Sequence, residues 1–306
     1  MDFGNLAIRF VFLSQTTTGI LGNLSLIFYY VVRCCRENTL KPTDWILMHL
    51  LAANALVILS TGVPQTMAVL GFKHFLNDFG CKLLLYIQGF VRSVSIGTTC
   101  LLIFYQALTI SPKKSCWKNY KVKCEKNISL IWILFILINF IYFPNTIVNM
   151  DNKNVSRKRD FGYCCIVGWD EIGASLYAAL VVCPEIFFSV LMFWSSGFMI
   201  VILYRHKHSV QHIRSTHVSS RTNPESRVTL NILILVSIFL FFYTLSSILR
   251  GCIALLYTQS WWLVNIDHFT SLCFPSLLPF VLMYRYSIVS KLCLSCKRHT
   301  NILVSF

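Results

Sequence analysis

Seven long apolar stretches constrain what this chain can fold into. A helix needs about 20 mostly apolar residues to cross the hydrocarbon layer of a bilayer, and every stretch reaches that length. The runs are continuous rather than alternating, which argues against a membrane β-barrel. The sequence therefore predicts an all-α membrane protein, with residues 1–306 forming a single domain, a seven-transmembrane helix bundle. The predicted helices span about residues 7–32, 45–70, 82–110, 127–149, 173–204, 228–257 and 262–286.

The composition supports a membrane protein. Hydrophobic residues make up 56% of the chain and charged residues 13%, whereas about 25% of the residues of an ordinary soluble domain are charged. The net charge of +15 would suggest nucleic-acid binding in a soluble chain, but in a membrane protein basic residues mark cytoplasmic loops. The chain has no nucleotide-binding, hydrolase or metalloprotease motif. We therefore expect no nucleic-acid partner, no metal, no cofactor and no enzymatic activity.

The distribution of Lys and Arg predicts the orientation of the helices. Most of the 27 basic residues lie in the first, third and fifth connections, at 33–44, 111–126 and 205–227, and in the C-terminal tail. The positive-inside rule therefore places these connections and the C-terminus in the cytoplasm, and the N-terminus outside. The basic loops can contact anionic lipid head groups, a cytoplasmic partner, or both. Four His at irregular spacing in the 205–227 loop do not predict a zinc site, because a solvated loop cannot fix their rings.

Two features concern the fourth connection, at 150–172, which the charge rule places outside. Asn154 stands in the glycosylation sequon Asn-Val-Ser, so we expect it to carry a glycan. Cys164 and Cys165 lie in the same connection, and Cys81 begins the third helix at its outer end. A disulfide is chemically reasonable in the oxidising exterior and would fasten this connection over the bundle. The residues alone leave open which of the two cysteines pairs with Cys81.

Charged side chains within the spans invite a partner or a function, because each costs about 2.5–3.5 kcal/mol at the bilayer centre. Arg92 lies about three helical turns from Cys81 in the third span, and Glu185 lies in the outer part of the fifth. The third and fifth helices are neighbours in such bundles, so we predict an Arg92–Glu185 ion pair, which serves either a ligand or the structure. Arg250 and Asp267 lie near helix ends, and we expect each to extend to the membrane interface, with a ligand contact as the alternative.

Uncharged polar residues and prolines within the spans are expected to shape the helix packing. Asn23 and Asn54 lie in the middle of the first and second helices, where buried amides usually hydrogen-bond to a neighbouring helix. Prolines in the spans should kink or break helices, and these are Pro144, Pro184, Pro275 and Pro279.

Several stretches of the sequence resemble the vomeronasal type-1 receptors, a family of pheromone receptors. The resemblance covers nearly the whole chain. It is carried by LKPTDWILMHLLAAN through STGVPQTM (40–67), RSVSIGTTCLLIFYQALTISP (92–112), MFWSSGFMIVILYRHKHSVQHI (192–213), NPESRVTLNILILVSIFLFFYTLSSI (223–248) and CFPSLLPFVLM (273–283).

The resemblance implies a G-protein-coupled receptor in the plasma membrane of vomeronasal sensory neurons, which binds a small-molecule pheromone and activates a heterotrimeric G protein of the inhibitory class. In this family the outer connection ends in Gly-Tyr-Cys, which matches Gly162-Tyr163-Cys164 and favours Cys164 as the partner of Cys81. Relatives often carry Arg-Asp in the fifth helix where this chain reads Pro184-Glu185, so ligand preferences do not transfer directly. A bitter-taste-type receptor and a small membrane transporter are the alternatives.

The resemblance and the charge pattern together suggest two sets of site residues. An outer cavity between the third, fifth, sixth and seventh helices would bind the ligand through Tyr86, Gln88, Arg92, Tyr177 and Glu185. The cytoplasmic end would face the G protein with Tyr105, Gln106, Arg205, Lys207 and Arg227. Cys293 and Cys296 lie close to the inner membrane face, where they are either palmitoylated or plain thiols.

Overall fold

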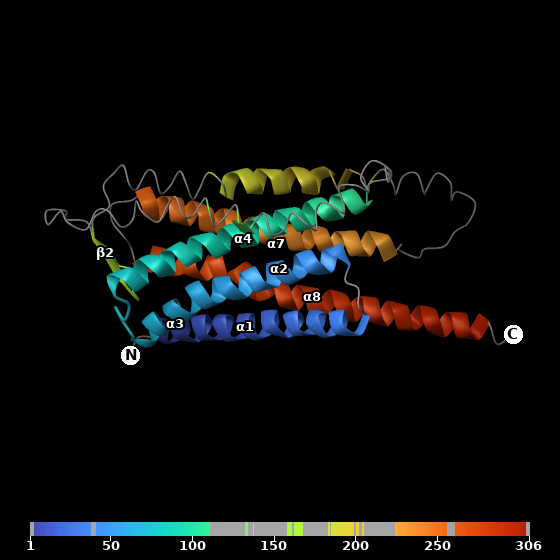
Figure 1. Ribbon diagram of the computed structural model, residues 1–306, viewed down its shortest axis with the longest axis horizontal. Helices are drawn as coiled ribbons and strands as arrows, with labels where there is room; N and C mark the ends of the chain where they lie inside the picture. Colours follow the sequence, from blue (N-terminus) through green and yellow to red (C-terminus); the bar gives the residue numbers. More distant parts are fainter. Residues whose placement is uncertain are drawn as a thin grey trace.

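The fold is a bundle of long helices that run side by side along the longest axis of the molecule (Figure 1). It is seen in a computed structural model of the chain, in which the described residues are 3–37, 41–110, 132–133, 137, 158–160, 162–167, 183, 185–198, 200–201, 204, 224–255 and 261–303.

The first, second, third, sixth and seventh predicted spans are helical. In chain order they are α1 (Phe3–Glu37), the combined helix of α2 (Pro42–Val57), η1 (Ile58–Gly62) and α3 (Val63–Leu70), α4 (Asp78–Ile110), α7 (Pro224–Leu255) and α8 (Trp261–Leu303). Within the described part of the chain, these are the 5 helices that are long and apolar enough to cross a membrane. The fifth span is described in part, as a shorter apolar helix at Glu185–Phe198. Almost all of the fourth span, 127–149, lies outside the described residues, so seven helices remain a prediction.

The helices α1 and α8 approach closely because α1 presents glycines to α8. A Cβ atom on Gly19 would lie 2.8 Å from Ser276 Oγ, and one on Gly22 would lie 2.9 Å from Pro279 Cβ. Small residues at such a contact let two backbones come together, which is a common way of packing helices in membranes. Asn23, one residue after Gly22, donates a hydrogen bond of 2.9 Å from Nδ2 to the carbonyl oxygen of Pro275 in α8. Pro279 has no N–H to offer that carbonyl four residues earlier, so the α1 amide supplies the donor from outside the helix.

The largest core cluster joins α1, α2, α4, α7 and α8. Its centre holds the rings of Phe239 and Tyr243 from α7 and Phe274 from α8, and all three are buried. Phe239 and Phe274 meet edge to face with their ring centroids 4.5 Å apart, a favoured geometry for aromatic pairs. This contact fixes how α7 packs against α8.

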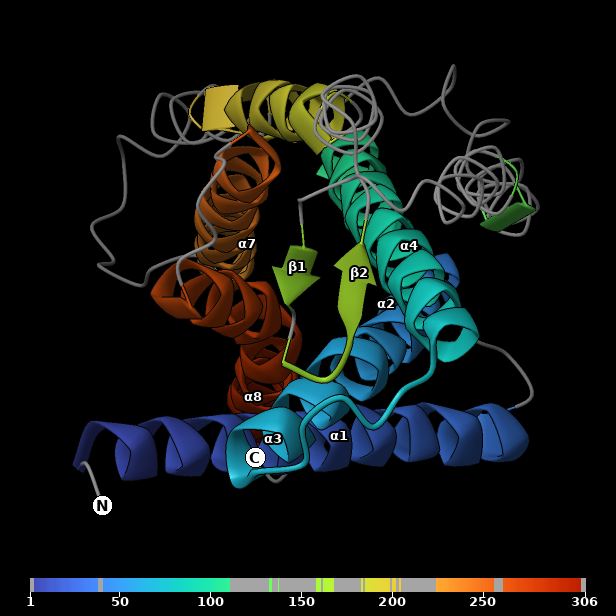
Figure 2. The ribbon, with the colours of Figure 1, turned by 90° about the vertical axis from the view of Figure 1, so that its left-hand side faces the viewer.

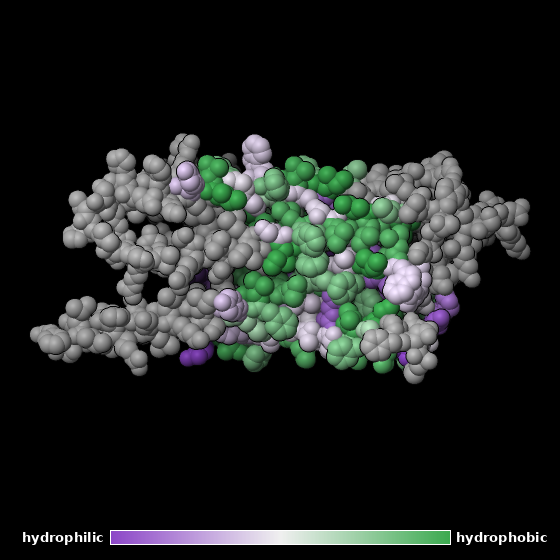
Figure 3. Space-filling model, turned by 180° about the vertical axis from the view of Figure 1, so that it is seen from behind, coloured by the Kyte–Doolittle hydropathy of each residue, from purple (hydrophilic) through white to green (hydrophobic). Residues whose placement is uncertain are grey.

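Large apolar side chains also cover the outside of the bundle. Phe10 in α1 is 71% exposed, and Phe193 and Trp194 in the Glu185–Phe198 helix are 74% and 77% exposed. Hydrophobic residues cover much of the described surface in the middle of the molecule (Figure 3). A patch of this kind would be unfavourable in water and marks a surface that contacts lipid or another apolar partner.

A short β-hairpin closes one end of the bundle, and it departs from the all-α prediction. The strand β1 (Lys158–Asp160) pairs antiparallel with β2 (Cys165–Val167), and Arg159 stands opposite Ile166. Seen end-on, the hairpin lies across the middle of the ring of helices (Figure 2). The start of α1 lies at this same end, whereas α8 ends at the opposite end and projects beyond the other helices (Figure 1).

Candidate functional site

The hairpin is fastened to the start of α4. Cys81 and Cys164 form a disulfide with their Cα atoms 5.9 Å apart, the pairing that the resemblance implied. Two backbone bonds add to it, because His74 N–H donates to the Gly162 carbonyl oxygen (3.1 Å) and Leu76 N–H donates to that of Tyr163 (3.5 Å). The connection between α3 and α4 therefore holds the turn of the hairpin by its backbone. The covalent bond and the backbone pairing together keep the hairpin over the bundle.

Tyr163, in the turn of the hairpin, inserts its side chain into the bundle and is fully buried. Its ring lies 6.3 Å from that of His268 in α8, and its hydroxyl oxygen lies 3.3 Å from Nε2 of Gln88 in α4. Gln88 Nε2 also donates to the carbonyl oxygen of Ser60 at 2.7 Å. Pro64 cannot donate an N–H to that oxygen, so here too an amide from a neighbouring helix contacts a carbonyl that precedes a proline by four residues. In this structure Gln88 therefore supports the hairpin and the second helix.

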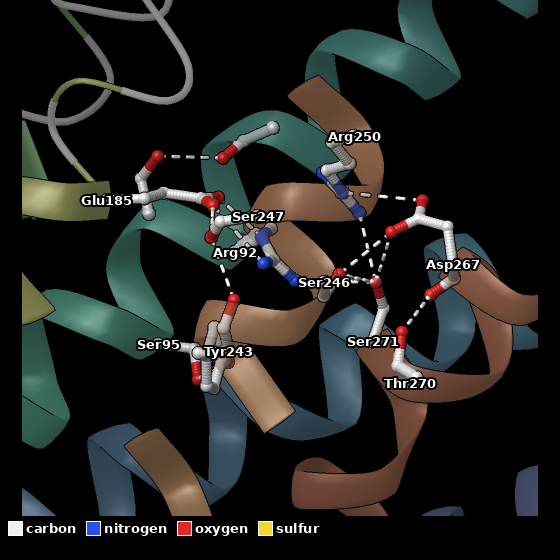
Figure 4. A network of polar contacts seen from close by, with 12 residues as sticks. Arg92, Ser95, Glu185, Tyr243, Ser246, Ser247, Arg250, Asp267, Thr270 and Ser271 are labelled. Carbon is white, nitrogen blue, oxygen red and sulfur yellow. Dashed lines mark hydrogen bonds and ion pairs between the residues drawn. The ribbon is translucent and has the colours of Figure 1, made fainter. Parts of the chain in front are cut away.

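The predicted ion pair between Arg92 and Glu185 is confirmed, and it lies deep in the bundle (Figure 4). Arg92 Nε donates to Glu185 Oε1 at 2.5 Å and Nη2 donates to Oε2 at 3.3 Å. The two side chains are only 4% and 7% exposed, so water screens their attraction little, and a bidentate pair is the strongest form of this contact. Ser247 in α7 also donates to Glu185 Oε2. Glu185 therefore links its own helix to both α4 and α7.

Tyr243 in α7 supports Arg92 from a second direction. The Arg92 Cζ atom lies 4.7 Å from the centroid of the Tyr243 ring, which is a cation–π contact. The Tyr243 hydroxyl lies 2.8 Å from Ser95 Oγ, and Ser95 Oγ donates to Asn54 Oδ1 at 2.7 Å. A buried polar chain therefore runs from α2 through α4 to α7 and ends at the ion pair. The expectation that Asn54 hydrogen-bonds to a neighbouring helix is confirmed.

Arg250 in α7 and Asp267 in α8 form a second ion pair, with Arg250 Nε 3.5 Å from Asp267 Oδ2. The expectation that each side chain extends separately to the membrane interface is wrong, because the two are only 13% and 8% exposed and lie against each other. Ser246 and Ser271 lie beside this pair and carry hydroxyl contacts between α7 and α8. The physical reason is that α7 packs on α8 along this stretch, so each charge finds its opposite within the bundle.

The structure describes some of the other predicted site residues and leaves the rest outside the described part of the chain. Tyr86 is half-buried on α4, and Tyr105 is buried in the core, whereas Gln106 beside it is partly exposed. Arg227 belongs to α7, although its side chain is outside the described set. The remaining predicted residues, which lie outside the described ranges, are Asn154, Tyr177, Arg205 and Lys207.

Sequence reasoning missed Tyr243 and the serines of the network, namely Ser95, Ser246, Ser247 and Ser271. Tyrosine and serine are common in membrane helices, and their role depends on which helix face meets which neighbour. Among the described residues, no group of three or more His, Cys, Asp or Glu is placed to hold a metal ion. The site is therefore a network of ion pairs and hydroxyl groups that joins α4, the Glu185–Phe198 helix, α7 and α8.

The fold and this site define a multi-pass α-helical membrane protein with a disulfide-fastened hairpin and a buried polar network. A family model described as "Vomeronasal organ pheromone receptor family" matches residues 6–295, and the chain belongs to that family. It is 43% identical over 293 residues to vomeronasal type-1 receptor 2 of Homo sapiens, covering 94% of this chain and 74% of that protein. It is 43% identical over 291 residues to vomeronasal type-1 receptor 4 of Homo sapiens, covering 94% and 96%. Vomeronasal type-1 receptor 44 of Mus musculus is 28% identical over 246 residues, covering 79% of each chain.

Proposed function

We propose that this protein is a G-protein-coupled pheromone receptor of the plasma membrane, with its N-terminus outside and its C-terminus in the cytoplasm. It binds a small chemosignal among the helices below the hairpin and activates a G protein of the inhibitory class. The observation that carries the proposal is the Arg92–Glu185–Ser247 cluster, which joins three helices through one carboxylate. A ligand that contacts this cluster can change how the three helices pack against one another.

The charge balance of the network suggests what kind of ligand it takes. Two guanidinium groups, of Arg92 and Arg250, face two carboxylates, of Glu185 and Asp267, and all four side chains are largely buried. A ligand with a net charge would need a new counter-charge in a region from which water is excluded. A neutral, mostly apolar molecule with one or two hydrogen-bonding groups avoids that cost. Small volatile or steroid-like molecules fit this description, with Tyr86, Gln88 and Tyr177 as further candidate contacts.

Activation requires that the ligand bind one arrangement of the helices better than another. Both Tyr243 and Ser247 of α7 contact the Arg92–Glu185 cluster, so α7 is the helix whose position a ligand there would alter. A helix of the G protein would then enter at the opposite end of the bundle. Gln106 and the basic connections at 111–126 and 205–227 would face it, including Arg205, Lys207 and Arg227. Tyr105 is buried and would reach a partner only after the core opens.

Calcium imaging tests the proposed function directly. Cells that express the receptor with a promiscuous G protein are screened against urinary and steroid fractions, and an active fraction is then applied to two variants. Ser247→Ala removes the α7 contact to Glu185, and we expect it to shift the half-maximal dose at least severalfold. Thr244→Val is the control, because the Thr244 hydroxyl donates to carbonyl oxygens of its own helix. A response that survives inactivation of the G protein, or an equal shift in both variants, would contradict the proposal.

Three further measurements test the finer parts of the proposal. An epitope tag at the N-terminus should be reached by antibody on intact cells, and a tag at the C-terminus only after permeabilisation. Treatment that inactivates the inhibitory class of G protein should abolish signalling through endogenous G proteins. Asn154→Gln should remove a glycan and increase the electrophoretic mobility of the protein.

A further inference from the structure

Ser271 in α8 lies where the two ion pairs of the network meet. Its hydroxyl oxygen is 3.4 Å from Arg92 Nη1 and 3.3 Å from Arg250 Nη2. The same oxygen is 2.6 Å from Ser246 Oγ and 3.5 Å from Asp267 Oδ1. The Ser271 side chain is buried, and Figure 4 shows contacts that join it to both arginines. One hydroxyl group therefore contacts groups from both ion pairs.

The protons of this cluster can be assigned by counting donors and acceptors. Ser246 Oγ lies 2.8 Å from Asp267 Oδ1, and since an ionised carboxylate only accepts, Ser246 donates its single proton there. In the 2.6 Å contact between the two serines, Ser271 must then be the donor and Ser246 the acceptor. The two lone pairs of Ser271 remain, and they accept from Arg92 and Arg250. The 3.5 Å contact of Ser271 with Asp267 is left without a proton, which agrees with its length.

We propose that Ser271 is a positioning residue that joins the Arg92–Glu185 and Arg250–Asp267 ion pairs into one unit. The first pair connects α4 to the Glu185–Phe198 helix, and the second connects α7 to α8. Two guanidinium groups on one oxygen repel each other, and the arrangement holds only while both carboxylates are present. A change in the packing of α7 against α8 therefore reaches Arg92 through Ser271. This inference goes beyond the proposed receptor function and depends on neither a ligand nor a G protein.

A double-mutant cycle measures this connection. Glu185→Gln and Asp267→Asn are made singly and together, and the purified full-length protein is unfolded by heat in detergent. With Ser271 present, the double variant leaves both guanidinium groups close together without a counter-charge. Its loss in Tm should exceed the sum of the two single losses by several degrees. In the Ser271→Ala background the guanidinium groups can separate, and the losses should add.

The proposal is overturned if, with Ser271 present, the double variant loses no more in Tm than the two single variants lose together. It is also overturned if the excess loss in Tm persists in the Ser271→Ala background. Thr270→Val provides the control background, because the Thr270 hydroxyl donates to carbonyl oxygens of α8 itself. The excess loss in Tm should remain in the Thr270→Val background, and its disappearance there would contradict a specific role for Ser271. Ser271→Thr keeps the hydroxyl and should retain the excess.

If the charge variants do not accumulate in the membrane, milder substitutions replace them. Ser247→Ala removes one donor to Glu185. Ser246→Ala removes one donor to Asp267 and the acceptor of the Ser271 proton. Their losses in Tm should fail to add when Ser271 is present and should add in the Ser271→Ala background. Additive losses in both backgrounds would show that Ser271 only fills space between α7 and α8.

Discussion

Exchanging the charges of Arg92 and Glu185 tests whether their ion pair stabilises the bundle. Arg92→Glu places two carboxylates against each other, and Glu185→Arg places two guanidinium groups against each other. Both side chains are less than a tenth exposed, and breaking a buried ion pair of this kind costs about 3–5 kcal/mol. The double exchange restores opposite charges and should recover most of that loss. It cannot restore the contacts that Arg92 makes with Tyr243 and Ser271 or the one that Glu185 accepts from Ser247. The lost cation–π contact alone should leave a deficit of about 0.5–2 kcal/mol.

The assay is surface expression of a tagged receptor by flow cytometry, together with the Tm of the purified protein in detergent. Each single variant should lose most of its surface expression, and the double exchange should recover the larger part. Arg33 and Asp44 form the comparison pair, since their ion pair of 3.4 Å joins a buried carboxylate to an Arg33 side chain that is 25% exposed. Because water reaches this guanidinium group, the same exchange there should cost less than at 92 and 185. A double exchange at 92 and 185 that stays as low as the singles would refute the reasoning.

Three further substitutions have expected outcomes that a thermal unfolding assay can check. Gly19→Ala should destabilise the protein because the new Cβ atom would lie 2.7 Å from an isoleucine side chain of η1. Gly197→Ala is the control, because its Cβ atom would meet nothing within 4 Å and should have little effect. Equal losses in Tm would contradict close packing of α1. Cys164→Ser removes the disulfide and should cost about 2–5 kcal/mol, whereas Cys183→Ser replaces a free, exposed cysteine and should be near neutral. Asn23→Leu removes the donor to the α8 proline carbonyl and should cost about 1–2 kcal/mol, and an unchanged Tm would show that water or another group serves that carbonyl.

Hydropathy predicted the positions of most helices but not their ends. The apolar run of the seventh span stops near residue 286, whereas α8 continues to Leu303, because a helix does not require apolar residues once it leaves the hydrocarbon. The hairpin was missed because β1 and β2 have three residues each, too few for an alternating pattern to show. These strands depend on tertiary contacts, chiefly the disulfide and the backbone hydrogen bonds from the connection between α3 and α4.

Two facts were enough to predict the Arg92–Glu185 pair: an isolated charge in a span needs a partner, and the third and fifth helices are neighbours in such bundles. The same reasoning failed for Arg250 and Asp267, which lie near helix ends where the interface offers an alternative to pairing. Their pairing follows from the rotation of α7 relative to α8, which a single sequence does not reveal. The roles of Tyr243 and Ser271 were inaccessible for that reason too, since each acts through contacts with two or more helices.

The length of α8 turns small changes inside the bundle into large displacements outside it. Pro279 lies against Gly22 of α1, and the helix continues for 24 further residues to Leu303. At 1.5 Å per residue that segment is a rod of about 36 Å. A bend of about 10° at the proline would therefore swing its far tip through about 6 Å, the rise of roughly one helical turn. A molecule bound to the end of α8 would therefore be displaced by a small bend at the α1–α8 contact, although it lies far from that contact.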